Sequence, residues 1–420
     1  MFCAKAGLVM RILNCMWSAE TEYRSIHKVM HSFEQALQPA EFTHCFLVGD
    51  PPNDFILQNA FSLYSSKKHT KNTLNNTIRL IYTTSDTWQY VNFHYLKFRL
   101  NMMKILFLVQ KEQRAILDRL YEGVAAHSEC NILWLSDKEQ ANLRKYFKEN
   151  VDTDKYDRIM LFLRIKKEMK QVPFLRTIPN LVFLEHDACQ NYMECKYKGR
   201  FSNYYSRLPW VRIIVSGATL AQRLQKEHFD AVFVSKAYDQ TFLKNLHRTR
   251  DVELGFIGSL GSGAYSERKK FLEKLAQKES LLITRTNSGE DYLNMLNRIR
   301  FFVSCDMGMG EYMSKNFEAL ACGCVLITYS QGDEENKAIG FKDMENVVLY
   351  KTLDELQHKL SLLRLDKALA ENIASKGQKL AEEYYNSDVV GKRIVEALIP
   401  DLRKQAEVGF WQQLRNRLGW

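Results

Sequence analysis

From residue 103 onward, short runs of β-branched and aromatic residues alternate with amphipathic stretches of helical periodicity. This alternation is typical of parallel α/β sheets, in which a helix returns the chain to the edge where the next strand starts. The first series of predicted strands is Lys104–Val109, Ile132–Leu135, Arg158–Leu163, Leu181–Glu185, Arg212–Ser216 and Ala231–Ser235. The second series is Leu254–Ile257, Ser280–Thr284, Phe301–Ser304, Val325–Tyr329 and Asn346–Tyr350. Each series suffices for one doubly wound domain, so the pattern predicts two Rossmann-like domains.

The polar, basic stretch Asn245–Asp251 separates the two series. We therefore predict an N-terminal Rossmann-like domain over residues 102–247 and a C-terminal Rossmann-like domain over 248–399. Residues 1–101 form a predicted N-terminal extension that imitates the start of another α/β domain, and both an accessory subdomain and a remnant without chemistry fit it. Residues 400–420 form a basic, aromatic tail.

Composition narrows the classes of protein that this chain can belong to. The 420 residues are 46% hydrophobic, which is ample for folded cores and excludes a disordered chain. No apolar run reaches the ~20 residues that span a bilayer, so we expect a cytoplasmic protein. The nine cysteines are scattered and predict neither a disulfide framework nor a zinc site. A net charge of +10 favours an anionic partner: a nucleic acid, a phosphorylated ligand or an acidic membrane.

A glycine-rich loop follows the strand predicted at Leu254–Ile257 and contains Gly258, Ser259, Gly261 and Gly263. Such loops let backbone amides approach a phosphate next to a helix N-terminus. The order of the glycines matches neither the dinucleotide fingerprint nor the P-loop. A tight strand-to-helix turn also needs glycine, so the loop alone does not establish a phosphate site.

A second candidate site lies in the first turn of the predicted helix Lys315–Ala321, where Lys315, Asn316 and Glu318 occur together. In open α/β sheets, ligands bind at the edge where this helix begins. A carboxylate suits the paired hydroxyls of a ribose, and an ammonium group suits a diphosphate. An exposed Lys/Glu helix face fits these two charged residues equally well.

The second half of the chain resembles GT-B glycosyltransferases of the group 1 class, of the family-4-like type that builds bacterial surface polysaccharide and lipopolysaccharide. The resemblance rests on motifs from the glycine-rich loop to about Ile399: Lys315, Phe317-Glu318-Ala319, Ala321-Cys-Gly323, Val325-Leu-Ile-Thr328, Glu345-Asn-Val-Val-Leu-Tyr350 and Leu353-Asp-Glu-Leu356. It implies that Glu318 holds the donor ribose and Lys315 the donor phosphates, with Gly258, Ser259, Gly261 and Asn316 beside them. It also implies that residues 102–247 are the acceptor domain, that residues 248–399 are the donor domain, and that no metal or other cofactor is needed. Related transferases often carry a second glutamate with seven residues between the pair, whereas Glu311 and Glu318 have six between them.

In the first half of the chain, the resemblance rests on Lys104-Ile-Leu-Phe-Leu-Val, on Leu181-Val-Phe-Leu-Glu-His186-Asp187 and on Val232-Phe-Val-Ser-Lys236. A His-Asp pair directly after a buried strand faces the cleft between two such domains, where a histidine can relay a proton. We therefore name His186, Asp187 and Glu311 as catalytic candidates. An exposed loop histidine is an equally good interpretation of His186.

These observations predict a glycosyltransferase that moves a sugar from a nucleotide diphosphate sugar to a hydroxyl group of a glycan or glycolipid acceptor. We expect its work to lie in cell-surface polysaccharide or lipopolysaccharide synthesis, with no nucleic-acid partner. The basic tail suggests a peripheral position on an anionic membrane. Two alternatives stay open: a nucleotide-sugar epimerase of the same fold, and a non-catalytic nucleic-acid-binding protein.

Overall fold

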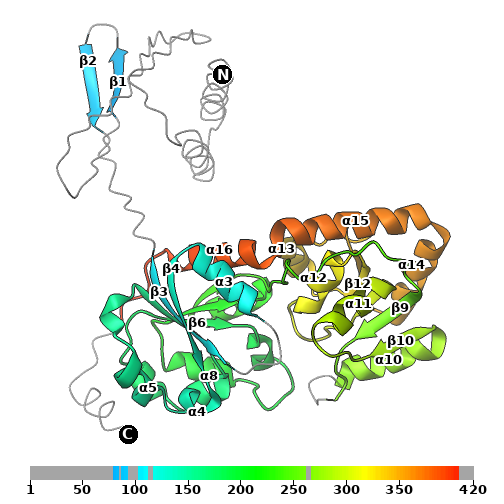
Figure 1. Cartoon of the computed structure of the whole chain (residues 1–420), viewed down its shortest axis with the longest axis horizontal. Helices are drawn as coiled ribbons and strands as arrows, with labels where there is room; N and C mark the ends of the chain where they lie inside the picture. The colour runs from blue at the N-terminus through cyan, green and yellow to red at the C-terminus, as the bar shows by residue number, and fades with distance from the viewer. Residues whose placement is uncertain (1–78, 85–86, 93–102, 112–116, 262–265, 406–420) are drawn as a thin grey trace. The chain divides into compact units, whose positions relative to one another are not determined.

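The structure, a computed structural model, describes residues 79–84, 87–92, 103–111, 117–261 and 266–405 (Figure 1). The chain divides into two compact units, Met1–Leu100 and Asn101–Trp420. Within the first unit, β1 (Arg79–Thr84) and β2 (Thr87–Asn92) pair in an antiparallel ladder. The rest of the predicted extension, and residues 406–420 of the predicted tail, lie outside the described residues.

The second unit begins with a six-stranded parallel sheet in the order β4-β3-β5-β6-β7-β8, which we call the first lobe together with its helices. Its strands are β3 (Lys104–Gln110), β4 (Glu129–Leu135), β5 (Arg158–Phe162), β6 (Leu181–Glu185), β7 (Arg212–Val215) and β8 (Asp230–Phe233). Its helical segments are α3 (Asp118–Ala126), α4 (Asp137–Gln140), α5 (Leu143–Asn150), the 3-10 turn η1 (Thr153–Lys155), α6 (Ile165–Glu168), α7 (Val172–Leu175), the 3-10 turn η2 (Ala188–Asn191), α8 (Arg200–Ser206) and α9 (Ala218–Lys226).

The second lobe is a five-stranded parallel sheet in the order β10-β9-β11-β12-β13 with its helices. Its strands are β9 (Val252–Ile257), β10 (Leu281–Thr284), β11 (Ile299–Ser304), β12 (Val325–Tyr329) and β13 (Val348–Tyr350). Its helices are α10 (Ser266–Lys278), α11 (Glu290–Arg298), α12 (Ser314–Ala321), α13 (Asp333–Ile339), α14 (Leu353–Leu365) and α15 (Lys367–Tyr384). The chain leaves β9 toward β10 on one side and returns to β11 on the other. The carboxyl ends of β9 and β11 therefore flank a topological switch point, where open α/β sheets bind ligands.

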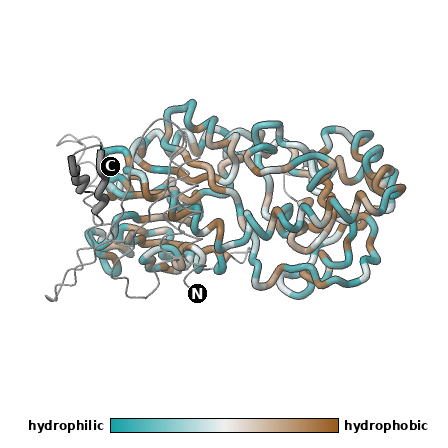
Figure 2. The backbone as a smooth tube through the Cα atoms, turned by 90° about the horizontal axis from the view of Figure 1, so that it is seen from above, coloured by the Kyte–Doolittle hydropathy of each residue, from teal (hydrophilic) through white to brown (hydrophobic). Residues whose placement is uncertain are grey.

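The apolar runs of the sequence become strands that are buried on both faces, as is typical of parallel sheets. In β3, Leu106 and Leu108 join one core cluster, while Ile105, Phe107 and Val109 join the cluster on the opposite face. The backbone coloured by hydropathy shows the hydrophobic stretches running through the interior of each lobe (Figure 2). The predicted pair of Rossmann-like domains is thus confirmed.

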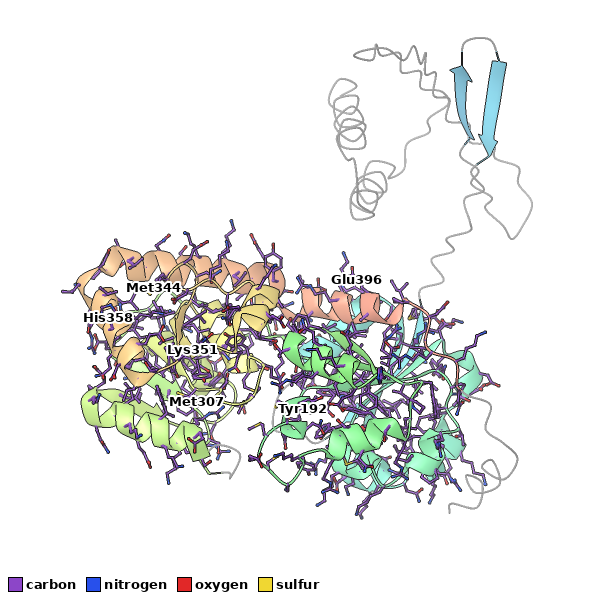
Figure 3. All side chains as sticks on the ribbon, turned by 180° about the vertical axis from the view of Figure 1, so that it is seen from behind. Tyr192, Met307, Met344, Lys351, His358 and Glu396 are labelled. Atoms are coloured by element: carbon purple, nitrogen blue, oxygen red, sulfur yellow. The ribbon has the colours of Figure 1, made fainter. Side chains whose placement is uncertain are left out.

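The final helix, α16 (Ser387–Leu398), packs against α3 of the first lobe although it follows the helices of the second. Figure 3 labels Glu396 on this helix beside the first lobe, and His358 on the second lobe. Val390, Ile394 and Leu398 of α16 belong to the same core cluster as Ile105 and Phe107. The stretch predicted as the donor domain, 248–399, therefore ends in a helix that completes the core of the first lobe.

Two glycines let α16 and α3 approach each other closely. A Cβ atom at Gly391 would lie 2.3 Å from the carbonyl carbon of Gly123, and one at Gly123 would lie 2.3 Å from the backbone oxygen of Ser387. Because backbone atoms stand at both contacts, a side chain fits only if the helices separate.

Gly391→Ala is expected to destabilise the protein, since overpacking a tight contact costs about 1 to 3 kcal/mol. Thermal unfolding followed by circular dichroism measures the effect. Glu396→Ala, at an exposed position of the same helix, serves as the control and should leave the melting temperature almost unchanged. Equal melting temperatures for Gly391→Ala and wild type would contradict the close packing of α16 on α3.

The division after Leu100 predicts that a chain starting at Asn101 folds without the preceding residues. Both parallel sheets lie entirely within Asn101–Trp420. The truncated protein should therefore keep the circular dichroism spectrum of the α/β unit and a cooperative thermal transition. An insoluble product, or one that melts without a transition, would show that the first hundred residues are needed for the fold.

Candidate functional site

Gly258 and Lys315 meet at the carboxyl end of β9. The amide of Gly258 donates to the carbonyl oxygen of Thr284 at 3.0 Å, and Lys315 Nζ donates to the carbonyl oxygen of Ile257 at 2.7 Å. A Cβ atom at Gly258 would lie 2.6 Å from the ring of Phe256 and 3.5 Å from Lys315 Nζ. Glycine is therefore required here because the aromatic ring leaves no room for a side chain.

Tyr292 of α11 lies between the two charged residues of α12. Its ring centroid is 5.7 Å from Lys315 Nζ, and its hydroxyl donates to the carboxylate of Glu318. Burial lowers the pKa of Lys315, and Glu318 partly offsets that effect. Burial also raises the pKa of Glu318, against the opposing influence of the Tyr292 hydrogen bond and of Lys315. The structure thus brings Gly258, Lys315 and Glu318 together at the β9/β11 switch point, and we call these residues with Tyr292 the donor cluster.

Two other predicted donor residues lie in the loop that follows Gly258. The amide of Gly261 donates to Ser259 Oγ at 3.3 Å, which tightens the turn. The loop then runs into residues 262–265, so Gly263 lies outside the described part of the chain.

Asn316 occupies a different environment from its neighbours Lys315 and Glu318. It is completely buried, and its Nδ2 donates to Asp306 Oδ2 at 2.7 Å and to the carbonyl oxygen of Met313 at 2.9 Å. Asp306 also pairs with Arg268 at 2.9 Å. The structure therefore places Asn316 on the buried side of α12, where it holds the loop that precedes the helix.

The side chain of Glu311, at the end of that loop, contacts residues of the first lobe. Its Oε2 accepts hydrogen bonds from Ser216, which follows β7, and from Lys236, which follows β8. The Lys236 Nζ to Glu311 Oε2 distance is 2.5 Å, and both residues are almost completely buried. Burial would lower the pKa of Lys236, but Glu311 and nearby groups raise it above its usual value, so the amine is a cation. We call Ser216, Lys236 and Glu311 the interlobe cluster.

A second carboxylate also joins the two lobes. Glu335 of α13 accepts a hydrogen bond from the backbone amide of Thr219, in the first turn of α9, at 2.8 Å. Glu335 is completely buried, and burial raises its pKa to about 7. One oxygen of Glu311 and one of Glu335 find no partner within the described residues.

His186 and Asp187 follow β6 at the same edge of the first sheet. Burial, with a contribution from Lys236, lowers the pKa of His186 to about 3, so the imidazole is neutral near pH 7. Its ring meets Phe162 edge to face at a centroid distance of 4.9 Å. Asp187 is exposed, and its amide donates to Glu185 Oε1 at 2.7 Å. Of the three predicted catalytic residues, Glu311 therefore contacts Lys236 directly, while His186 and Asp187 lie within its electrostatic reach.

Several residues of these clusters were not among the sequence candidates. Tyr292 and Glu335 sit in ordinary amphipathic helices, where nothing in the pattern distinguishes them. Lys236 comes directly after the strand predicted at Ala231–Ser235, the same signal that identified His186. Ser216 was predicted as the last residue of a strand, whereas β7 ends one residue earlier, at Val215.

Two pockets of similar size open on the described surface. One, of about 430 Å³, lies in the first lobe and is lined by Met169, Lys198, Gly199, Arg200, Asn203, Tyr204 and Arg207. The other, of about 400 Å³, lies in the second lobe beyond β10 and is lined by Arg285, Thr286, Asn287, Asp291, Asn294, Met295 and Arg298. Arg285 contributes to lowering the pKa of Lys315, so the second pocket lies within electrostatic reach of the donor cluster. Over the described residues, no three His, Cys, Asp or Glu side chains gather in a way that could hold a metal ion.

Comparison with solved structures shows the fold. Sucrose-phosphate synthase from Thermosynechococcus elongatus is similar with a TM-score of 0.51 and 12% identity, over 70% of this chain and 98% of that one. Anabaena HepE, solved in complex with UDP and glucose, is similar with the same TM-score and identity, over 70% of this chain and 99% of that one. HepE in complex with UDP-glucose gives the same values. Comparison with curated protein sequences gives no match.

The two facing parallel sheets and these similarities define a GT-B fold. Residues 236–396, from Lys236 to α16, match the family described as "Glycosyl transferase-like". Residues 236–396 thus carry a glycosyltransferase family match, consistent with the group 1 class, and the expected enzyme class is confirmed.

Because the pKa of Glu335 is raised, we expect the free energy of unfolding to depend on pH. A carboxyl group whose pKa rises from 4.5 to about 7 on folding stabilises the fold while it is protonated. That stabilisation is complete below about pH 4.5 and is lost as the pH rises through 7, at a cost of the order of 3 kcal/mol. Glu335→Gln keeps an acceptor for the Thr219 amide and removes the titration. Its free energy of unfolding, measured by urea denaturation, should therefore fall less than that of wild type between pH 5 and pH 8.

Glu371→Gln, at an exposed position of α15, is the matched control and should show the wild-type pH profile. Parallel pH profiles for wild type and Glu335→Gln would show that this carboxyl group is not the one that titrates.

Proposed function

We propose that the enzyme transfers a sugar from a nucleoside diphosphate sugar to a hydroxyl group of a glycan or glycolipid acceptor. The observation that carries this proposal is the donor cluster, in which a half-buried ammonium and a half-buried carboxylate stand one helical turn apart at the switch point of the second sheet. The solved HepE complexes with UDP and with UDP-glucose support the class of donor.

Each member of the donor cluster has a distinct role in this proposal. Lys315 faces the diphosphate beside Gly258 at the carboxyl end of β9, where its Nζ is held by the Ile257 carbonyl oxygen. Glu318 accepts hydrogen bonds from the ribose hydroxyls, and the Tyr292 hydroxyl holds its carboxylate in place. Ser259 and Gly261 offer further donors from the loop that follows Gly258.

Lys315 also explains how the bond to the sugar is broken. Negative charge develops on the leaving diphosphate in the transition state. A preorganised cation in a half-buried site therefore stabilises the transition state more than the ground state. Lys315 is already held by the Ile257 carbonyl oxygen, so little reorganisation is needed when the donor binds. Catalysis then depends on position and charge supplied by this chain's own residues.

The first lobe holds the acceptor in this proposal, with His186 and Asp187 at the edge of the sheet near the interlobe cluster. A histidine whose pKa is about 3 stays neutral and can exchange hydrogen bonds with an acceptor hydroxyl. Glu311 has one oxygen committed to Ser216 and Lys236, so we assign it a positioning role between the lobes.

The place of action is part of the same proposal. A basic enzyme acting on acidic or lipid-linked acceptors suits the cytoplasmic face of a membrane, in the synthesis of cell-surface polysaccharide or lipopolysaccharide. None of the helices that the structure describes has both the length and the apolar composition to cross a bilayer.

Replacing Glu318 by Ala should weaken UDP binding at least about tenfold, because each hydrogen bond to a charged acceptor contributes roughly 1.5 to 3 kcal/mol. Lys315→Ala should weaken UDP much more than uridine, which carries no phosphate. Isothermal titration calorimetry of wild type and both variants with uridine, UDP and UDP-glucose separates these effects.

Glu371→Gln is again the control, and melting temperatures verify that each variant is folded. Wild-type affinity for UDP in Glu318→Ala would remove the donor-site assignment. Conversion of UDP-glucose to an epimer without loss of UDP would favour the epimerase over the transferase.

A further inference from the structure

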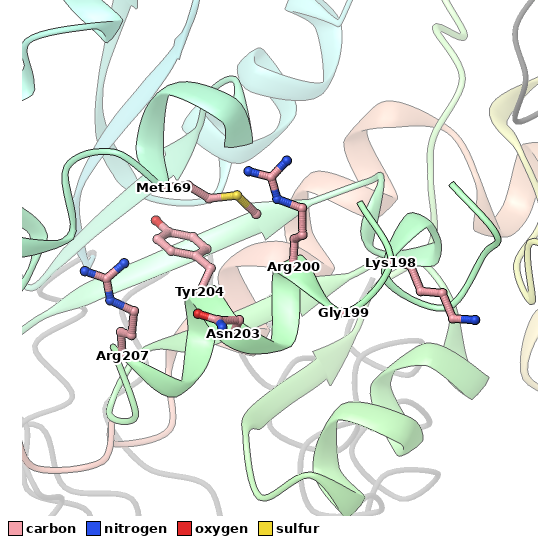
Figure 4. Close-up of a pocket in the computed structure, with 7 residues that line it drawn as sticks. All are labelled: Met169, Lys198, Gly199, Arg200, Asn203, Tyr204 and Arg207. Carbon is pink, nitrogen blue, oxygen red and sulfur yellow. The ribbon is translucent and has the colours of Figure 1, made fainter. Parts of the chain in front are cut away.

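The pocket of the first lobe lies where the chain leaves β5 and β6. Met169 comes from the end of α6, which follows β5, and the remaining lining residues come from α8 and the residues that flank it, which follow β6 (Figure 4). Both segments start from the carboxyl ends of parallel strands. The pocket therefore belongs to the edge of the first sheet that carries His186, Asp187 and Ser216.

The pocket has a fixed floor. Tyr204 is 3% exposed, stacks on Phe183 at 5.4 Å between ring centroids, and donates its hydroxyl to Glu168 at 3.3 Å. Burial raises the pKa of Glu168 to about 7, so this carboxyl group is partly neutral at physiological pH.

The wall that carries the cations is fixed as well. Asn191 of η2 accepts hydrogen bonds from the amides of Phe201 and Ser202 at 3.0 and 3.1 Å, and its Nδ2 donates to Ser202 Oγ at 2.7 Å. These bonds hold the first turn of α8 against η2. The backbone at Arg200, the first residue of α8, is thus fixed, and Arg207 follows at the end of the same helix.

The rim of the pocket carries positive charge without a compensating carboxylate. Arg200 and Arg207 are exposed, and neither forms an ion pair with any acidic side chain that the structure describes. Arg200 stacks over the ring of Tyr197 at 5.6 Å, which orients it without neutralising it. Lys198, in contrast, pairs with Glu194 and points away from the other lining residues (Figure 4).

The pocket is connected to the interlobe cluster through η2. Cys189 of η2 is 4% exposed, and its pKa is raised by burial and then by Glu311. The chain that leaves this buried contact continues directly into the segment and helix that line the pocket. The Asn191 hydrogen bonds therefore join η2, which lies near Glu311, to the first turn of α8, which begins at Arg200.

We propose that this pocket binds an oxyanion of the acceptor, a phosphate or carboxylate group carried by the saccharide that receives the sugar. Two guanidinium groups present the paired donors that match either oxyanion. The aromatic floor of Tyr204 and the thioether of Met169 offer an apolar surface to the attached sugar ring. This inference rests on the proposed function and adds to it the chemical class of the acceptor.

The test titrates glucose 1-phosphate and glucuronate, as phosphate and carboxylate probes, into enzyme saturated with UDP so that the donor cluster is already filled. The double variant Arg200→Gln/Arg207→Gln should bind whichever probe the wild type binds at least about tenfold more weakly. Lys376→Gln/Lys392→Gln removes the same charge from exposed positions of α15 and α16, and should behave like wild type. Arg200→Lys/Arg207→Lys, which keeps the charge and loses the paired donors, should give an intermediate affinity.

Equal affinities of both probes for wild type and the Arg200→Gln/Arg207→Gln variant would overturn the proposal. The proposal would also be overturned if that variant lost binding to phosphatidylglycerol vesicles but kept its binding to the sugar phosphate. The pocket would then be a membrane-binding surface. UDP affinity, measured separately, reports on the donor cluster alone. If UDP does not bind to the wild type, the proposed donor is wrong. The same probe titrations, carried out on variants that also carry Lys315→Ala, then still test the anion site.

Discussion

The buried contact of Glu311 with Lys236 and Ser216 is the interaction on which the relation between the two lobes depends. A charged pair removed from water costs several kcal/mol per ion, and the attraction between the partners offsets this only when the geometry is good. Glu311 Oε2 meets both a cation and a hydroxyl, while its other oxygen has no partner among the described residues. Such a contact adds little net stability, but it permits few arrangements of the groups that make it. We infer that it serves to fix geometry.

The loop between β11 and α12 connects this buried contact to the donor cluster. Asp306 accepts hydrogen bonds from Ser304 at the start of the loop and from Met313 and Asn316 at its end. Gln331 closes the loop from the other side, accepting from the amide of Gly310 and donating to the carbonyl oxygen of Asp306. The loop is therefore a braced unit, in which the position of Glu311 is tied to the first turn of α12.

The sequence predicted the strands of the second unit well, because strands buried on both faces appear as continuous apolar runs. The range of β6 and of β12 agrees with the prediction to the residue. The crossing of α16 was not predicted, because its pairing with α3 depends on Gly123 and Gly391, which are distant in sequence and unremarkable alone. Lys315 and Glu318 were found by spacing and resemblance, whereas Tyr292 was not. A tyrosine that orients a carboxylate on a different helix is visible only when both helices are in place.

Asn316 shows how spacing on a helix limits such predictions. Residues one position apart on an α-helix point in directions about 100° apart, so neighbours in sequence do not share a face. Lys315 and Glu318, three positions apart, face the carboxyl end of β9 and Tyr292, and Asn316 consequently faces Asp306. The buried Asn316 amide and the half-buried Lys315 thus have different partners on the same helical turn. Asn316 anchors the loop that carries Glu311 to the first lobe, and that anchoring holds Lys315 at the carboxyl end of β9, where we propose that the diphosphate binds.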